Sequence, residues 1–408
     1  MEIKCTKSNL IMFGYFIAAT ILLLDCTDNF PGTSLLRKFK YIFIVILLLD
    51  FITSNLKRIS KPCAVVVGCL MLHTVLFGVV IVNPAVAELT KTHFSEMMIY
   101  LLFLGFLTNA VERYRCELKF IEATSAACAI FMLWTGVTHI SNFVNPLYYI
   151  YVFSRNARIR SHFGVGDPNY MGYYCLIALV FFFVLWYKYL ENNTLTKKRK
   201  YFLLGISGWT VLILFSTGSR SSVLSFLIFI AIWCYKKYLK PKWGKNAFLY
   251  IALLFIICVA FVGLNWTDIW GNANREANIS VNIPVFNHLN AFWKGMGYIE
   301  SSGFYNDAYG YDTWPVDIYY LYIFLSTGVI GTVIISIPLV YILVKLLKKS
   351  DDFVDKLILP AYLAILFDGM WQVNIFTYRY IATLFIGALL LISISLHKNR
   401  VLTRMQQK

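Results

Sequence analysis

The sequence predicts an all-α polytopic membrane protein with about twelve transmembrane helices. Hydrophobic residues make up 59% of the 408-residue chain and charged residues only 14%, whereas a soluble protein carries about a quarter charged residues. The mean hydropathy is +0.65. Apolar runs of roughly 17–25 residues, each long enough to cross a bilayer, recur along the whole chain. No soluble domain is visible, so we expect residues 1–408 to form a single integral-membrane domain.

The expected spans follow the apolar runs. The first run, Leu10–Leu24, is followed by Asp25-Cys26-Thr27-Asp28, where a signal peptide would have small residues. We therefore interpret this run as a retained first span. The spans are expected near residues 9–25, 40–54, 63–82, 95–110, 119–138, 170–188, 201–216, 221–236, 247–264, 316–344, 356–370 and 379–396.

The distribution of basic residues predicts the orientation. With both termini in the cytoplasm, every inner segment carries several of the 37 Lys and Arg residues, as the positive-inside rule requires. The net charge of +16 then reflects this bias and attraction to anionic lipid headgroups. It does not indicate a nucleic-acid partner.

Two long outer segments stand apart from the short connections. They cover residues 139–169 and 265–315, and the second follows the ninth span and is rich in Asn, Gly, Tyr and Trp. Long loops with such residues are usually functional rather than linkers. We expect both loops to fold over an outward-facing cavity.

Outward arginines are the main candidates for binding an anion. A guanidinium group binds phosphate with two hydrogen bonds and stays charged when it is buried. The alternative interpretation is that these arginines pair with lipid headgroups or with Asp167, Asp317 and Asp368. The candidate residues for binding a lipid-linked diphosphate are Arg155, Arg158, Arg160, Arg220, Arg275 and Arg379.

Two polar motifs lie at predicted membrane boundaries. The segment Gly164–Asn169 precedes the sixth span and contains Gly166, Asp167, Pro168 and Asn169, and an Asp-Pro pair suits the first turn of a helix. This pair is equally compatible with a helix start that has no other role. The segment Ser216–Ser221, with Gly218 and Arg220, predicts a tight turn between the seventh and eighth spans.

A carboxylate near the outer surface is expected to act as a general base on a sugar hydroxyl. Asp317 is the carboxylate beside the start of the tenth span, and we predict it, with Arg220, as a catalytic residue. The alternatives are Asp307, Asp312, Glu300, Glu276, His288 and His162, whereas His73 and His93 are interpreted as structural or interfacial. Dense tyrosines after residue 304 favour a platform for sugar rings.

Several classes of site have no sequence signature. The chain has no Walker loop, no Rossmann fingerprint and no metal-ligand spacing, so we expect neither a cofactor nor a metal, and a pump with its own ATPase is excluded. The nine cysteines show no disulfide framework and are expected to act as small apolar side chains.

Four motifs in order carry a resemblance to a known family. Over roughly residues 120–345, the chain resembles the superfamily of O-antigen polymerases and O-antigen ligases, which are bacterial inner-membrane glycosyltransferases. The motifs are Gly166-Asp167-Pro168-Asn169 with Gly172, Thr217-Gly218-Ser219-Arg220, Lys294-Gly295-Met296-Gly297 and Gly328-Val329-Ile330-Gly331.

The resemblance implies metal-independent glycosyl transfer on the periplasmic face, with residues 139–169 and 265–315 as periplasmic loops. The donor would be a glycan on undecaprenyl diphosphate, and a chain-length regulator would be a partner. Family arginines bind the diphosphate: Arg220 matches the one at the start of the eighth span, while Arg275 and Arg379 are looser matches.

Two alternatives to a polymerase remain open. Ligases of this superfamily carry a His-Asn pair shortly before the Gly-x-x-Gly segment, whereas this chain has Asp317-Ile318 there, which favours a polymerase. A flippase or other transporter fits twelve spans equally well. Transporters, however, tend to have broken helices and polar groups near mid-membrane, whereas the polar groups here gather at the outer ends of the spans.

Overall fold

The computed structural model describes most of the chain. The described residues are 6–28, 30, 38–54, 59–83, 87–145, 160–239, 279–298, 316, 318–349, 351–378 and 381–406. Within these ranges the regular secondary structure is helical and contains no strand. The ninth expected span, 247–264, and most of the large loop 265–315 lie outside the described residues.

The helices lie close to the expected spans. They are α1 (Lys7–Leu24), α3 (Phe39–Thr53), α4 (Lys61–Val75), α5 (Ala87–Tyr114), α6 (Glu117–Thr138), α8 (Pro168–Glu191), α9 (Lys197–Ser216), α10 (Arg220–Cys234), α15 (Asn282–His288), α17 (Tyr319–Leu347), α18 (Leu359–Asp368) and α19 (Ile381–Gln406). Three π-helical turns extend α4 to Val80, extend α10 to Leu239 and precede α18 from Val354. A 3-10 turn covers Ile140–Asn142.

Six helical segments of the described chain are long and apolar enough to cross a membrane, which agrees with the predicted all-α membrane class. These segments are Lys7–Leu24, Lys61–Val80, Thr90–Tyr114, Glu117–Thr138, Pro168–Glu191 and Tyr319–Leu347. Tyr41–Thr53 and Ile381–Leu396 are apolar but shorter. The number of twelve spans therefore stays a prediction.

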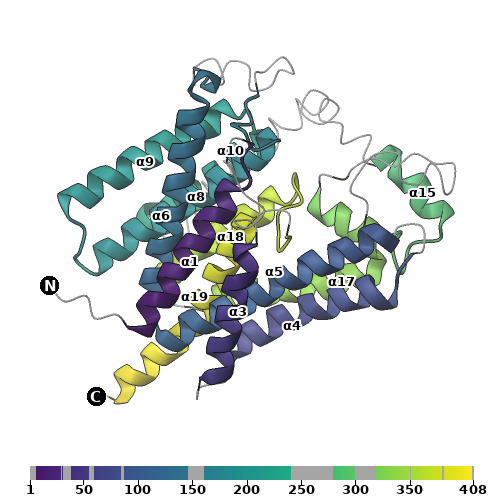
Figure 1. Cartoon of the computed structure of the whole chain (residues 1–408), viewed down its shortest axis with the longest axis horizontal. Coiled ribbons are helices and arrows are strands. Elements are labelled where there is room, and N and C mark those ends of the chain that lie inside the picture. The colour runs from purple at the N-terminus through teal and green to yellow at the C-terminus, as the bar shows by residue number, and fades with distance from the viewer. Residues whose placement is uncertain are drawn as a thin grey trace.

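The helices form two groups with α19 between them (Figure 1). Helices α1, α6, α8, α9 and α10 pack on one side, and α4, α5 and α17 pack on the other. Helix α19 contacts members of both groups, and Leu384, Leu389 and Leu391 on it are fully buried. Because lipid is as apolar as these side chains, close packing rather than the hydrophobic effect holds such helices together.

Side-chain caps define where several helices begin. Thr6, Ser60, Asp167 and Thr196 each accept a hydrogen bond from a backbone N–H in the first turn of α1, α4, α8 and α9. These groups have no partner inside the helix, so the cap replaces one missing hydrogen bond.

A buried carboxylate joins three helices at one end of the molecule. Asp50 of α3 is 5% exposed. It lies 2.7 Å from Lys7 Nζ of α1 and 2.8 Å from Arg113 Nη1 of α5, and the Tyr114 hydroxyl donates to it at 2.7 Å. Both basic partners belong to segments that the charge distribution places in the cytoplasm.

Other residues from segments predicted in the cytoplasm also contact one another. The Lys119 ammonium donates to Asn9 Oδ1 at 2.6 Å, and buried Lys188 lies 3.8 Å from a Glu117 oxygen. The structure thus gathers residues from separate inner segments at one end of the bundle. Which side of the membrane this end faces stays a prediction.

We predict that Asp50→Ala destabilises the protein by about 3–5 kcal/mol, because removing one partner leaves the Arg113 guanidinium, which is only 6% exposed, without its carboxylate. Thermal unfolding of the purified protein in detergent measures the effect. The matched control is Glu88→Ala, whose pair with Lys91 is exposed and contributes little to stability because water and salt screen it. Equal melting temperatures for the two variants would contradict the structural role of Asp50.

Candidate functional site

The first polar motif forms the start of α8. Gly166 has φ +79°, a left-handed conformation that glycine adopts without strain. The Asp167 side chain accepts a hydrogen bond from Asn169 N at 2.6 Å, and Pro168 is the first residue of α8. The prediction that Asp167 caps a helix here is confirmed.

The second polar motif forms the turn between α9 and α10. Gly218 has φ +63°. The Thr217 hydroxyl donates to Leu214 O at 2.7 Å and accepts from Ser219 N at 3.1 Å. These bonds hold a tight turn, as predicted, and make Arg220 the first residue of α10. Arg220 is half-buried.

The two motifs lie against each other. A Cβ atom placed on Gly172 of α8 would lie 2.6 Å from the Ser219 Cβ atom, so the absence of a side chain at Gly172 lets the turn approach α8. Beside this contact, Ser161 N donates to Ser216 O at 3.3 Å. Arg160 reaches the same end of α8, where Nη2 donates to Asn169 Oδ1 at 2.7 Å.

The connection between α18 and α19 completes this region. Gln372 donates from Nε2 to the Ser221 hydroxyl at 2.6 Å. One turn further along α10, the Ser225 hydroxyl donates to Asp368 Oδ1 at 3.1 Å, and Asn374 Nδ2 binds the other Asp368 oxygen. Asp368 is fully buried. The first turns of α10 are thereby fixed to the α18–α19 connection.

The polar residues of this connection were missed by the sequence interpretation. Gln372 and Asn374 were not considered, and Asp368 was considered only as a charge partner for an arginine. Two amide side chains within an apolar region are the signal that would have found them, because buried amides need specific partners.

We call this region the arginine site. It is made of Arg160, Arg220, Asn169 and the first turns of α8 and α10. Helix N-termini carry a partial positive charge and exposed N–H groups, so they attract anions. Two guanidinium groups beside two helix N-termini make a site suited to a phosphate or diphosphate.

The other predicted ligands and the predicted base are not tested by this geometry. Asp317 and four of the predicted arginines lie outside the described residues: Arg155, Arg158, Arg275 and Arg379. Among the residues that the structure describes, no group of three or more His, Cys, Asp or Glu side chains is placed to hold a metal ion.

The third and fourth motifs also meet, at a break in α17. Gly328 has φ +62° inside this helix. Met296 N and Gly297 N donate to the carbonyl oxygens of Leu325 and Ser326 at 2.9 and 3.0 Å. On the other side of the break, Val329 N donates to Phe292 O at 2.9 Å. Gly297, with φ +93°, is therefore part of this junction and not of the arginine site.

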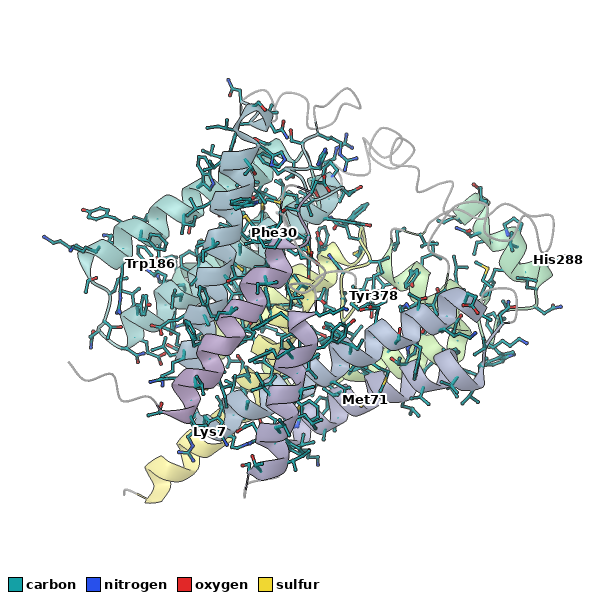
Figure 2. All side chains as sticks on the ribbon, in the orientation of Figure 1. Lys7, Phe30, Met71, Trp186, His288 and Tyr378 are labelled. Atoms are coloured by element: carbon teal, nitrogen blue, oxygen red, sulfur yellow. The ribbon has the colours of Figure 1, made fainter. Side chains whose placement is uncertain are left out.

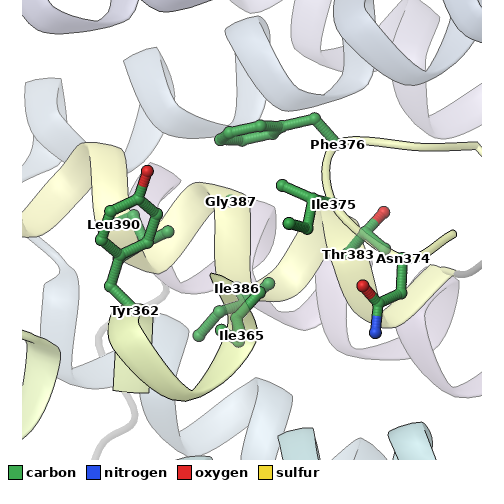
Figure 3. A pocket seen from close by; sticks show the side chains of 9 residues that line it. All are labelled: Tyr362, Ile365, Asn374, Ile375, Phe376, Thr383, Ile386, Gly387 and Leu390. Carbon is green, nitrogen blue, oxygen red and sulfur yellow. The ribbon is translucent and has the colours of Figure 1, made fainter. Parts of the chain in front are cut away.

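Two cavities in the described part of the chain lie away from the arginine site. Figure 3 shows one between α18 and α19, of about 10 Å³, lined by Asn374, Thr383 and apolar side chains. This volume holds about one water molecule, so it is too small for a sugar. A larger cavity of about 330 Å³ is bordered by apolar residues of α4 and α5 such as Cys63, Val67 and Leu101.

Comparisons with known proteins do not assign the chain to a family. No protein-family model matches the sequence, and neither does any curated protein.

We predict opposite effects for two Gly→Ala substitutions. Gly172→Ala places a methyl group against Ser219 and should destabilise the protein by about 1–3 kcal/mol through overpacking. Gly205→Ala adds a methyl group in open space on exposed α9 and should stabilise the protein by up to about 1 kcal/mol. Thermal unfolding measures both variants, and a neutral Gly172→Ala would show that the two motifs are not in tight contact.

Proposed function

We propose that the chain is a surface-polysaccharide polymerase of the O-antigen type. It joins repeat units carried on undecaprenyl diphosphate by glycosyl transfer at the periplasmic face of a bacterial inner membrane, with both termini in the cytoplasm. The observation that carries the proposal is the arginine site, where Arg160 and Arg220 stand beside the first turns of α8 and α10.

The arginine site supplies what the donor substrate needs. When the sugar leaves undecaprenyl diphosphate, negative charge develops on the departing diphosphate. Fixed positive groups at that place stabilise the transition state more than the ground state. Arg220 is the main candidate because its helix is fixed by Ser219 against α8 and by Ser221 to Gln372.

The acceptor hydroxyl has to lose its proton. Asp317 remains the proposed base, although it lies outside the described residues. Its neighbourhood supports the proposal, since Tyr319 N donates to Gly369 O at 3.0 Å. The start of α17 is thereby held next to the α18–α19 connection, which itself contacts α10 through Gln372.

One observation favours a second function. The break of α17 at Gly328 is typical of transporters, in which interrupted helices bind substrate near mid-membrane. A carrier for lipid-linked glycans is therefore the alternative candidate.

We predict that Arg220→Ala abolishes polymerisation, lowering its rate by roughly 100–1000-fold as expected for the loss of one transition-state contact. The measurement is the surface-polysaccharide ladder of a strain that lacks the gene and is complemented with each variant. Wild type restores the ladder, Arg220→Ala leaves single repeat units on the acceptor, and Arg220→Lys restores part of it because lysine keeps only the charge.

The control is Arg199→Ala. Arg199 lies at the other end of α9, where it binds Thr194 O at 2.9 Å and stacks on Tyr189, and its loss should leave the ladder unchanged. Bare acceptor with accumulated lipid-linked polymer in the deletion strain would instead identify a ligase. Repeat units retained on the cytoplasmic side would identify the carrier.

A further inference from the structure

A second cluster of buried polar groups lies outside the arginine site. Its members are His73 of α4, Thr90 of α5, Ser326 of α17, and Tyr298, which lies before α17. All four residues are between 1% and 4% exposed. Each has a side-chain polar atom with no hydrogen-bond partner within the described chain: His73 Nε2, Thr90 Oγ1, Tyr298 OH and Ser326 Oγ.

Three of these residues lie near His93, and the fourth, Ser326, lies next to Tyr298. The Tyr298 ring stacks on the His93 ring with 3.6 Å between centroids. Thr90 precedes His93 by three residues on α5, so the two side chains share one helix face. His73 lies within electrostatic range of His93. Ser326 adjoins Tyr298, because its carbonyl oxygen accepts the hydrogen bond from Gly297 N at 3.0 Å.

Four buried polar atoms without hydrogen-bond partners in one region of the described chain need a physical explanation. A buried hydroxyl or imidazole nitrogen that loses its water without gaining a partner destabilises the folded protein. Replacing these groups by apolar ones of the same shape would remove that cost. Each unsatisfied buried group in a native protein requires an explanation, and completion of its hydrogen bond by a ligand is one.

The chemistry of the cluster indicates the kind of ligand. The unpartnered atoms are two aliphatic hydroxyls, one phenol and one imidazole nitrogen, so they offer donors and acceptors without charge. Aromatic rings from Tyr298, His93 and Tyr378 lie together, and Tyr378 lies near the centre of the molecule (Figure 2). Flat rings beside neutral hydrogen-bonding groups suit a sugar.

We propose that this cluster, the His93 site, binds the acceptor sugar and that Tyr298 and Ser326 hydrogen-bond its hydroxyl groups. The inference rests on the proposed function in that it names the second substrate of the same reaction. Because the four atoms are closed off here, binding includes an outward movement of residues 291–298, on which the Trp293 side chain is 63% exposed.

The two sites are joined through one short connection. Gln372, before α19, contacts Ser221 next to Arg220, and Tyr378 of the same connection lies edge-on to His93 with 5.1 Å between ring centroids. An acceptor at the His93 site and a diphosphate at the arginine site would therefore lie on either side of residues 369–378.

The test uses the full-length protein in nanodiscs. The probe is the repeat-unit oligosaccharide of the source organism's surface polysaccharide, joined to a short alkyl chain without diphosphate, so that it serves only as acceptor. Binding is followed by tryptophan fluorescence, with Trp293→Phe identifying the local signal. We expect Tyr298→Phe and Ser326→Ala to weaken binding roughly 3–10-fold each, the value of one neutral hydrogen bond.

Thermal unfolding without the probe provides an independent readout. Both variants should keep the melting temperature or raise it by roughly 1–4 °C, because they remove a buried group without a partner. The control is Tyr341→Phe. Tyr341 lies on α17, C-terminal to Ser326, and its hydroxyl also has no partner within the described chain. It should leave probe binding unchanged.

Three results would overturn the inference. In the first, the probe does not bind to wild type, and in the second, wild type and both variants bind it equally. In the third, both variants have lowered melting temperatures, and this would show that structural water satisfies these groups. Failure of the proposed function is seen separately as a normal ladder in the deletion strain. Probe binding that depends on Tyr298 would then still stand as a sugar site.

Discussion

The backbone contact between residues 292–297 and the break in α17 is the constraint on which the two candidate sites depend. Inside a membrane every N–H and C=O group needs a partner from the protein, and a helix broken at Gly328 leaves several without one. The neighbouring segment supplies them through Met296, Gly297 and Phe292. Because a Cβ atom on Gly295 or Gly328 would collide with the opposite backbone, this junction requires glycine at both positions.

Hydrogen bonds and ring contacts connect this junction to both candidate sites. The hydrogen bonds that satisfy α17 also hold the segment whose Tyr298 stacks on His93 next to Ser326. The first residues of the same helix bind Gly369, and three residues later Gln372 holds the first turn of α10. A displacement of residues 291–298 would thus be transmitted toward Arg220 through backbone hydrogen bonds and the side-chain hydrogen bond between Gln372 and Ser221.

The sequence predicted the helical membrane class and the local geometry of the motifs, because both follow from short-range physics. Hydropathy marked the apolar helices, and the Asp-Pro pair marked the start of α8. The contacts between Gly172 and Ser219 and between Gly295 and Ser326 could not be predicted, since each joins segments distant in the chain. The interpretation of His93 as structural or interfacial looked only at one residue. That interpretation stays a prediction, and the unpartnered groups that packing brings near His93 come from distant parts of the chain.

The distribution of buried charge bears on whether the chain transfers a sugar or carries a substrate. Among the described residues, the buried charged side chains include Asp50, Arg113 and Lys188 near one end of the bundle and Asp368 near the other. A carrier for an anionic lipid-linked glycan needs polar groups along its path through the membrane. Helix α8 instead buries an unbroken apolar stretch from Cys175 to Phe182. The break in α17 is filled by the protein's own backbone, so it presents no open site at mid-membrane. The two candidate sites lie on either side of residues 369–378, which is the arrangement that the proposed transfer between two substrates needs.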